Sequence, residues 1–139
     1  MRALGGKTGI DYLGYKNLVG SFYPASEIRI SIETLSTLPV REYRNGLAEL
    51  IKHGFLEGGD FLDRIEAGKA EILSRDPEIM TDMVGRSLAV KGHVVEEDFR
   101  ENGIRAHLNL GHTFAHALES VSGFADWAHG EAVAWGMAK

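Results

Sequence analysis

Histidines at helical spacing are the residues of this sequence most able to do chemistry. His112 and His116 lie four residues apart in the segment LNLGHTFAHALE (residues 108–119), and His129 follows soon after it. Residues four apart share one helix face, so both imidazoles are expected to point into the same volume, together with Asn109. A catalytic zinc ion typically takes three protein ligands and keeps one position open. The pattern therefore predicts a catalytic metal site.

Spacing alone does not identify the three ligands. It favours His112 with His116, and His129 or a carboxylate can complete the set. The sequence contains no cysteine, so a metal must be bound by histidine, aspartate or glutamate. Histidine pairs at this spacing also arise by chance on helices that bind no metal, and that alternative stays open.

Cationic and amide side chains form a second group of candidates, because they stand near glycines, helix starts or the histidine segment. They are Lys7, Lys16, Asn17, Lys52, Lys91, Arg105 and Asn109. A lysine flanked by glycines can bind phosphate through backbone N–H groups and its own charge. The segment Gly5-Gly6-Lys7-Thr8 lacks the first glycine of a G-x-x-x-x-G-K-[ST] loop, so a P-loop nucleotide site is a weak match.

Lys91 falls along the apolar stripe of a predicted helix, between Leu88 and Val95. One alternative is that its aliphatic stem packs while the ammonium group reaches solvent. The other is that the ammonium meets an anionic partner, either a carboxylate or a bound phosphate.

The composition is that of an ordinary globular chain, and it narrows the possible partners. The 139 residues suffice for one domain with a core, and 44% of them are apolar and 25% charged. A net charge of −5 without a basic run disfavours nucleic acid as a partner. No apolar stretch approaches the ~20 residues of a membrane span, and there is no signal-peptide core. We therefore expect a cytoplasmic protein that does not contact membranes.

The elements that must position these groups are mostly helical in pattern. Residues 28–32 alternate apolar and polar side chains, which predicts a short strand, and residues 34–38 fit one helical turn. Helices are predicted over residues 40–56 and 60–73 from their apolar periodicity. A further helix is predicted to begin after Asp76, with the aspartate as N-cap and proline in the first position.

Apolar faces are predicted for two of these helices. The face of the first long helix comprises Leu47, Leu50, Ile51 and Phe55. The face of the histidine helix, opposite its imidazoles, comprises Leu110, Phe114, Ala117, Leu118 and Val121. Both ends of the sequence indicate part of a larger protein, because no element precedes the first glycine-rich segment and the last helical pattern is interrupted.

Four segments together resemble the 3-dehydroquinate synthase family, the cyclising enzymes of the shikimate pathway. They are Gly5–Gly9 with Lys16-Asn17, Gly46–Gly54, Lys91 through Arg105 with its Glu101-Asn102-Gly103 turn, and Leu108–Glu119 with His129-Gly130-Glu131. Their order and spacing resemble that family across nearly the whole chain.

The resemblance implies a fold and an assembly. The expected fold class is mainly α: a helical metal-binding domain preceded by a short β/loop segment left from an N-terminal NAD-binding α/β domain. Residues 1–33 would be the end of the NAD-binding domain and a linking strand. Residues 34–139 would be a truncated helical domain that binds metal and substrate. Family members are commonly homodimers, so a homodimer is expected for the full-length enzyme.

The resemblance also implies residue roles. It places the metal, Zn²⁺ or Co²⁺, on Glu49, His112 and His129, and it places Lys16 near the cofactor NAD. The positions that match family contacts to substrate are Lys7, Asn17, Lys52, Lys91, Arg105, Asn109 and His116. An arginine suits a substrate carboxylate because its planar fork can bind both oxygens.

The implied reaction converts a phosphosugar acid, 3-deoxy-D-arabino-heptulosonate 7-phosphate, to 3-dehydroquinate. NAD oxidises a ring hydroxyl, phosphate is eliminated, the ketone is reduced again, and an intramolecular aldol step closes the carbocycle. A divalent metal suits the first step because it acidifies the hydroxyl and polarises the carbonyl.

Three alternatives remain open at this point. One is another sugar-phosphate cyclase, such as 2-deoxy-scyllo-inosose synthase, which Arg105 with Asn109 disfavours because an arginine is needed for a carboxylated substrate. A metal-dependent alcohol dehydrogenase has little use for so many lysines. A folded remnant without catalysis is the third, because no glycine-rich dinucleotide-binding region is present.

Overall fold

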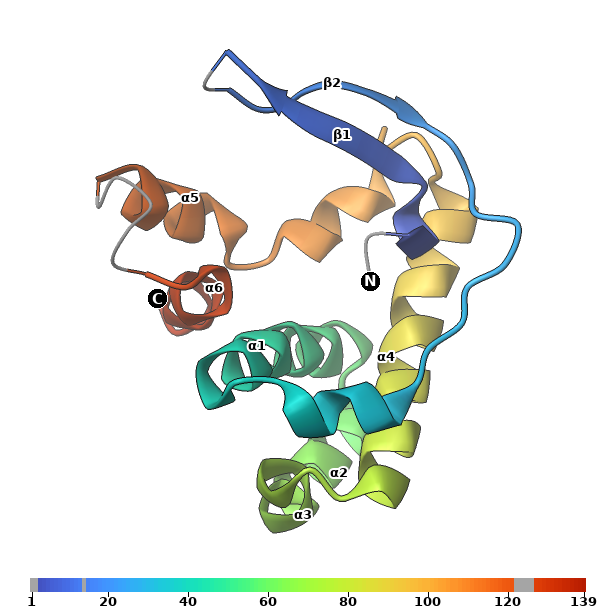
Figure 1. Cartoon of the computed structure of the whole chain (residues 1–139), viewed down its shortest axis with the longest axis vertical. Coiled ribbons are helices and arrows are strands. Elements are labelled where there is room, and N and C mark those ends of the chain that lie inside the picture. The colour runs from blue at the N-terminus through green and yellow to red at the C-terminus, as the bar shows by residue number, and fades with distance from the viewer. Residues whose placement is uncertain (1–2, 14, 122–126) are drawn as a thin grey trace.

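Helices make up most of the molecule. The computed structural model describes residues 3–13, 15–121 and 127–139, and the side chains of Lys16 and Asn17 lie outside the described part. Six α-helices are described (Figure 1): α1 Val40–Glu57, α2 Gly59–Ala67, α3 Lys69–Ser74, α4 Pro77–Glu97, α5 His112–Val121 and α6 His129–Met137. Short 3-10 turns occupy Ala3–Gly5, Ile32–Thr37 and Ile104–Asn109. The predicted mainly α fold class, with a short β segment before the helices, is confirmed.

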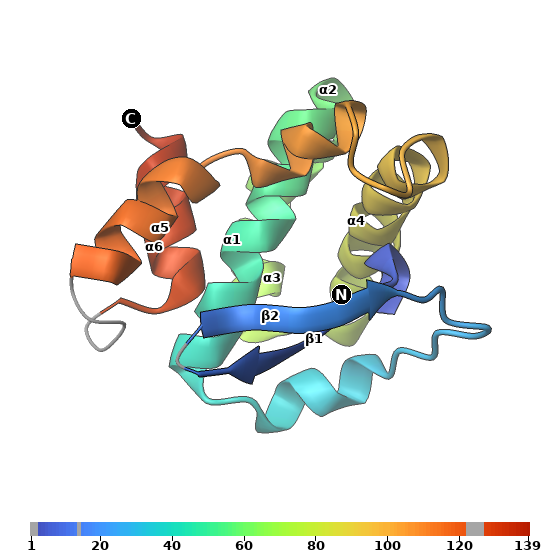
Figure 2. The same ribbon diagram turned by 90° about the horizontal axis from the view of Figure 1, so that it is seen from above.

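A two-stranded antiparallel hairpin precedes the helices. Strand β1, Lys7–Tyr12, pairs with strand β2, Tyr15–Phe22, in a register that places Lys7 opposite Phe22. The hairpin lies across the ends of the helical part and not within it (Figure 2). Most of its apolar side chains are consequently exposed to solvent, among them Ile10 and Leu18.

The strand predicted over residues 28–32 is wrong, because the chain there runs without regular structure into the 3-10 turn Ile32–Thr37. Alternating side chains form a strand only when a neighbouring strand completes its hydrogen bonds. No strand pairs with this segment in the described part of the chain, and Ile28 and Ile30 are exposed. The helical turn predicted over residues 34–38 is confirmed.

Helix α1 confirms the predicted long helix, but its buried face differs from the predicted one. Leu50 is buried as expected, whereas Phe55 is 54% exposed. The polar side chains of Lys52 and His53 are buried in its place. Helix α1 packs against α2, α4 and α6, so the face turned toward those helices is buried whatever its polarity.

Glycine interrupts the helix predicted over residues 60–73. Helix α2 ends at Gly68, whose N–H bonds to the carbonyls of Arg64 and Glu66, and α3 begins with the next residue. Helix α4 then begins as predicted, because the side chain of Asp76 accepts hydrogen bonds from the backbone N–H groups of Glu78 and Ile79.

Two separate cores result from this arrangement. The larger one lies among α1, α2, α3 and α4 and is made of large side chains: Tyr43, Leu50, Phe61, Ile72, Met80 and Met83. The smaller one lies between α5 and α6 and is made of Ala115, Ala132 and Val133, with Leu118 and Met137 packed against it.

The apolar face predicted for the histidine helix is largely wrong. Phe114 is 50% exposed and Val121 is 90% exposed, and Leu110 and Ala117 are exposed as well. The buried residues of α5 are Ala115 and Glu119, which face α6. Two members of the predicted face still make contacts: Leu118 packs against the smaller core, and the Phe114 ring meets that of Trp135 on α6 edge to face.

Candidate metal and substrate site

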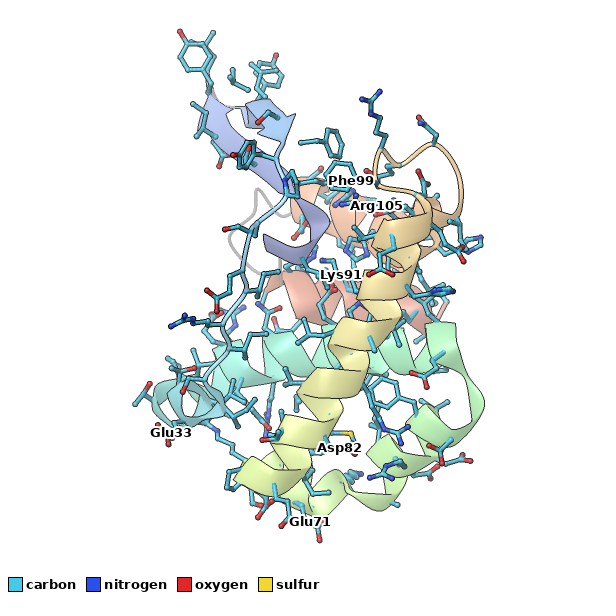
Figure 3. The ribbon with its side chains drawn as sticks, turned by 90° about the vertical axis from the view of Figure 1, so that its right-hand side faces the viewer. Glu33, Glu71, Asp82, Lys91, Phe99 and Arg105 are labelled. Carbon is cyan, nitrogen blue, oxygen red and sulfur yellow. The ribbon has the colours of Figure 1, made fainter. Side chains whose placement is uncertain are left out.

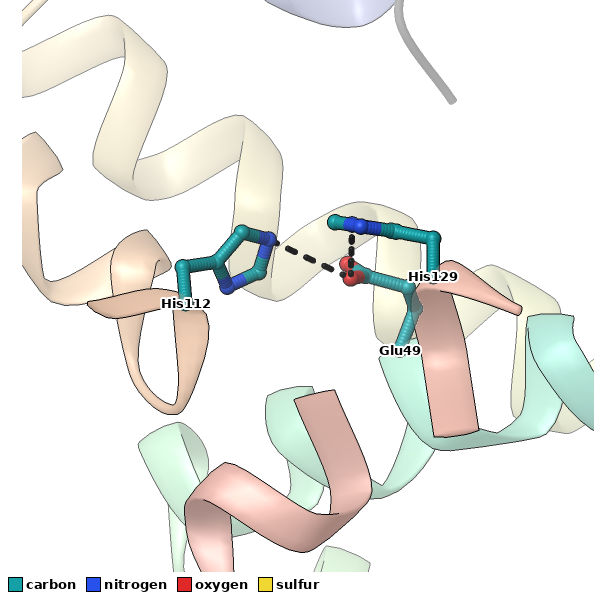
Figure 4. Close-up of side chains that lie close together, drawn as sticks. All are labelled: Glu49, His112 and His129. Atoms are coloured by element: carbon teal, nitrogen blue, oxygen red, sulfur yellow. Dashed lines mark ion pairs between the residues drawn. The ribbon is translucent and has the colours of Figure 1, made fainter. Parts of the chain in front are cut away.

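Three potential metal ligands from three helices converge at one point. Nε2 of His112 lies 3.6 Å from Oε1 of Glu49, and Nε2 of His129 lies 3.8 Å from the same oxygen (Figure 4). One ligand atom from each residue lies within 4.8 Å of the other two. Among the described residues this is the one group of three histidine or carboxylate side chains with that proximity.

Close contacts between helices set the positions of these ligands. Glu49 projects from the middle of α1, and His112 and His129 are the first residues of α5 and α6. The backbone N–H of Gly130 donates to Oδ1 of Asn45, one turn before Glu49 on α1. A Cβ atom at Gly130 would collide with the backbone of Asn45, so a glycine is required for α6 to approach α1 this closely.

Hydrogen bonds at Nδ1 fix the tautomer of both histidines. Nδ1 of His112 lies 3.1 Å from the carbonyl oxygen of Leu110, and Nδ1 of His129 lies 3.0 Å from Oε1 of Glu119. A carbonyl oxygen and an ionised carboxylate only accept hydrogen bonds, so each Nδ1 carries the proton and donates it. The lone pair of each Nε2 therefore faces Glu49, as metal ligation requires.

Glu49 has one satisfied and one unsatisfied carboxylate oxygen. Its Oε2 accepts a hydrogen bond of 2.7 Å from Nζ of Lys52, whereas its buried Oε1 has no hydrogen-bond partner among the described residues. A buried acceptor without a partner is costly. A divalent cation between this oxygen and the two Nε2 atoms would satisfy all three groups, so the residues fit a His₂Glu zinc site.

The protonation states also suit a cation. Burial opposes ionisation of Glu49, but the hydrogen bond and charge of Lys52, with smaller contributions from His112 and His53, leave its pKa below the ordinary value. Burial is the main cause that lowers the pKa of His112. The site therefore offers an anionic carboxylate and a neutral imidazole, which are the forms that bind metals.

His116, which spacing alone paired with His112, does not join this group. Its ring lies 5.8 Å from the His112 ring in an edge-to-face arrangement, and its side chain is exposed. His116 and Asn109 instead line the cavity beside the three candidate ligands.

That cavity, of about 900 Å³, also receives most of the predicted cationic residues. Lys7, Lys52, Lys91 and Arg105 all line it, and they come from β1, α1, α4 and the turn before α5. Lys91 lines the cavity, and burial, followed by the nearby charge of Lys52, lowers its pKa. Its binding to an anionic partner stays a prediction. Four glutamates among the described residues line the same cavity, and two of them, Glu101 and Glu49, form ion pairs with Lys7 and Lys52. The lysines and the arginine are the side chains of this lining that suit an anionic substrate.

Arg105 is already engaged by the backbone. Its Nη1 donates to the carbonyl of Phe99 at 2.6 Å and its Nη2 donates to the carbonyl of Gly5 at 2.8 Å. Figure 3 shows Phe99 and Arg105 close together near the end of α4, with Lys91 below them on the same helix. Arg105 thus ties the start of the chain to the segment after α4, a role that the sequence did not indicate.

Other residues near the site were not singled out from the sequence. Glu101 forms an ion pair with Lys7, and Glu119 contacts His129. His53 and Ser87 join through a hydrogen bond of 2.6 Å between α1 and α4, and burial lowers the pKa of His53 to about 4. Helical spacing was an available signal for Glu119, because it lies two turns after His112.

Two predicted contacts cannot be placed. Lys16 and Asn17 belong to β2, but their side chains are outside the described residues. Their assigned roles, toward NAD and toward substrate, stay predictions. The proposed division between residues 33 and 34 also stays a prediction.

The fold and the site together define a helical domain that presents a His₂Glu group at a cavity lined by lysines, an arginine and glutamates. Sequence models of two domains match the chain: "3-dehydroquinate synthase N-terminal" over residues 2–45 and "3-dehydroquinate synthase C-terminal" over residues 46–139. The chain belongs to the 3-dehydroquinate synthase family.

Curated relatives carry the same family name. The chain is 48% identical to a 3-dehydroquinate synthase of Geobacter sp. (strain M21), over 97% of this chain and 37% of the relative. It is 50% identical to that of Nitrosospira multiformis, over 96% of this chain and 37% of the relative. The chain thus spans little more than a third of the length of these relatives.

A solved structure supports the fold. The chain is similar to 2-epi-5-epi-valiolone synthase from Streptomyces hygroscopicus subsp. jinggangensis 5008, solved with NAD⁺ and Zn²⁺ bound, with a TM-score of 0.85. The two share 28% identity, and the match covers 98% of this chain and 38% of that one. None of the described helices is both long enough and apolar enough to cross a membrane.

Proposed function

We propose that this chain forms the metal- and substrate-binding part of a 3-dehydroquinate synthase. The reaction is the NAD- and metal-dependent conversion of 3-deoxy-D-arabino-heptulosonate 7-phosphate to 3-dehydroquinate with elimination of phosphate. The observation that carries the proposal is the shared cavity, in which Glu49, His112 and His129 stand beside a set of cationic side chains. The names of the curated relatives support it.

Glu49, His112 and His129 would hold the metal, Zn²⁺ or Co²⁺, because these ligands suit both ions. When bound, such an ion acidifies a hydroxyl group and polarises a carbonyl. Lys52 keeps Glu49 ionised through its hydrogen bond and charge, so the carboxylate stays available as a ligand.

NAD would supply the transient oxidation, as the solved relative's bound NAD⁺ supports. The described residues of this chain contain an antiparallel hairpin but no strand–turn–helix unit with a glycine-rich turn. They therefore do not fit a dinucleotide by themselves. We propose that NAD binding depends mainly on the greater length that the relatives have, with Lys16 as a contact from this chain.

The cationic residues would bind the substrate's two anionic groups. We assign phosphate and hydroxyl contacts to Lys7, Lys52, Lys91 and Asn109, with His116 beside them at the mouth of the site. Arg105 would bind the carboxylate with the N–H groups that its backbone contacts leave over. Lysines around a leaving phosphate would stabilise its charge as the C–O bond breaks.

His116 has the position and chemistry for proton transfer. It is exposed at the cavity, and its ring stands edge-on to that of His112. An imidazole is a common general acid or base, so His116 would accept or return a proton at the substrate. We propose that His116 contacts the substrate or its phosphate rather than the metal.

A second candidate function is cyclisation of a different sugar phosphate, as in 2-deoxy-scyllo-inosose synthase. The observation that favours it is Arg105, whose two terminal nitrogens already donate to backbone carbonyls in the described structure. A substrate without a carboxylate would not need this arginine.

We further propose, on the family resemblance, that the full-length enzyme is a homodimer and that it is located in the cytoplasm.

The test is phosphate release from a zinc-loaded preparation that contains NAD. The seven-carbon keto acid phosphate and glucose 6-phosphate are supplied separately, with His129→Ala as the metal-site control. Release from the first substrate alone supports the proposal, and release from glucose 6-phosphate alone supports the second candidate. Because NAD binding is proposed to need the greater length of the relatives, the preparation is the full-length enzyme. Zinc binding without phosphate release from either substrate would overturn the proposed function.

A further inference from the structure

The two histidines of the candidate metal site are held by different kinds of partner. His112 donates from Nδ1 to a backbone carbonyl, that of Leu110, which no substitution removes. His129 donates from Nδ1 to a side chain, Glu119, at 3.0 Å. The orientation of one ligand therefore depends on the backbone, and that of the other depends on a single replaceable carboxylate.

Glu119 contacts His129, one of the three candidate ligands, from a neighbouring helix. It lies on α5, whereas His129 begins α6, and residues 122–126 that connect them lie outside the described part. Its side chain is 7% exposed, compared with 38% for His129. A buried carboxylate in a medium of low polarity holds its imidazole partner more strongly than an exposed one does.

We propose that Glu119 is a positioning residue for the metal site, acting through His129. It holds the His129 ring with the proton on Nδ1 and with Nε2 turned toward Glu49. The negative charge of Glu119 also makes the lone pair of Nε2 more basic and so a stronger metal ligand, as carboxylate partners of metal-bound histidines do. This inference rests on the metal site in the proposed function, and it adds a residue to which no role has been given.

The competing explanation is that Glu119 only fills space between α5 and α6. In that case its replacement would change stability but neither the tautomer of His129 nor the affinity of the folded protein for a metal. The test therefore needs readouts that follow the imidazole and the metal separately from folding.

The first readout uses the metal-free protein. Long-range ¹H–¹⁵N correlation spectra report which ring nitrogen of each histidine carries the proton. We expect the Nδ1–H form for His129 in the parent and a shift toward the Nε2–H form in Glu119→Gln and Glu119→Ala. His112 is the internal control and should keep the Nδ1–H form in all variants, because its partner is a backbone carbonyl.

The second readout is zinc affinity, measured by competition with a chelator. Loss of such a carboxylate typically weakens metal binding by about 10- to 100-fold, and we expect this range for Glu119→Gln. Glu66→Gln is the matched control, because it removes the same charge from an exposed position on α2 and should leave affinity unchanged. Circular dichroism with thermal melting identifies any variant that does not fold, and Glu119→Gln preserves the side-chain volume to limit that outcome.

The outcomes separate this inference from the proposed function. If the parent binds zinc and Glu119→Gln matches it within twofold, with an unchanged tautomer, the role of Glu119 is overturned and the metal site stands. If the parent binds no zinc, the metal part of the proposed function fails. The spectra of the metal-free protein then still decide whether Glu119 orients His129.

Discussion

The α1–α4 region and the α5–α6 region are built in different ways. The first buries large side chains such as Phe61, Met80 and Met83, whereas the second is held by Ala115, Ala132 and Val133. Burial of apolar area scales with side-chain size, so most of the stability of the fold resides in the first region. The candidate site draws its carboxylate from that region and its imidazoles from the second.

This difference indicates that the two regions position their site residues in different ways. In the α1–α4 region, the packing of large apolar side chains fixes the helices that carry Glu49, Lys52 and Lys91. In the region with small side chains, His112 and His129 are positioned by close backbone approach at Gly111, Gly130 and Gly136 and not by large apolar side chains. The hydrogen bonds at Nδ1 therefore contribute more to the orientation of the two imidazoles.

The largest expected effect comes from removing a metal ligand that the α5–α6 region supplies. His129→Ala should abolish stoichiometric zinc binding, because it removes one of three ligands, whereas His116→Ala should keep the metal and impair turnover in a complete enzyme. Zinc content of the purified variants measures the first expectation. Loss of zinc in His116→Ala together with its retention in His129→Ala would reverse the ligand assignment.

A core truncation tests where stability resides. Phe61→Ala should reduce the free energy of unfolding by about 3–5 kcal/mol, because it leaves a cavity in the large core. Phe55→Ala, on the last turn of α1, is the matched control, and its 54% exposed ring should make the change small. Urea denaturation measures both. Equal losses for the two variants would contradict the observed burial.

The buried His53 should make the first region sensitive to acid. Burial, with the nearby charge of Lys52, lowers its pKa from 6.5 to about 4, so the folded state keeps it neutral while the unfolded chain takes up a proton. The stability from this group is complete above pH 6.5 and is lost as the pH falls toward 4, by about 3 kcal/mol.

The measurement is urea denaturation at about pH 7 and about pH 4.5 for the parent and for His53→Gln. The variant should be less stable near neutral pH, because its bond to Ser87 changes, but its stability should fall less on acidification. His107→Gln, at an exposed histidine, should keep the slope of the parent. An unchanged slope in His53→Gln would assign the acid sensitivity to other groups.

The smallest effect concerns the start of α4. Asp76→Ala removes the acceptor for two backbone N–H groups and should cost about 1 kcal/mol of stability. Asp76→Asn retains a capping oxygen and should cost less. Because α4 supplies none of the three candidate metal ligands, zinc affinity should be the same in both variants. A change in zinc affinity would show that the two regions are coupled more tightly than their packing indicates.

The helices could be predicted because their signals are local. The apolar period identified α1, and Asp76-Pro77 marked the start of α4 within the sequence itself. Which residues are buried depends on neighbouring helices, so Phe55 and Phe114 were assigned to buried faces but are about half exposed. The strand prediction for residues 28–32 was wrong for a similar reason, because a strand requires a neighbouring strand to complete its hydrogen bonds.

The candidate site was only partly accessible from spacing. The i, i+4 rule pointed to His112 and His116, but the closest group joins Glu49 and His129 to His112 through tertiary contacts between three helices. Only the family resemblance pointed to that set in advance. Leu110 and Glu119 orient the two histidines through their Nδ1 atoms. A sequence rule that searches only for metal ligands does not predict these contacts.

Gly130 has a consequence for which changes the chain can tolerate. Its hydrogen atom occupies the place where any other side chain would collide with Asn45, so even a single methyl group must push α6 away from α1. Such an exchange would displace His129 from Glu49 while leaving every ligand in the sequence. A motif search would still report an intact site in a protein that had lost it, because the smallest side chain in the motif determines whether the larger ones meet.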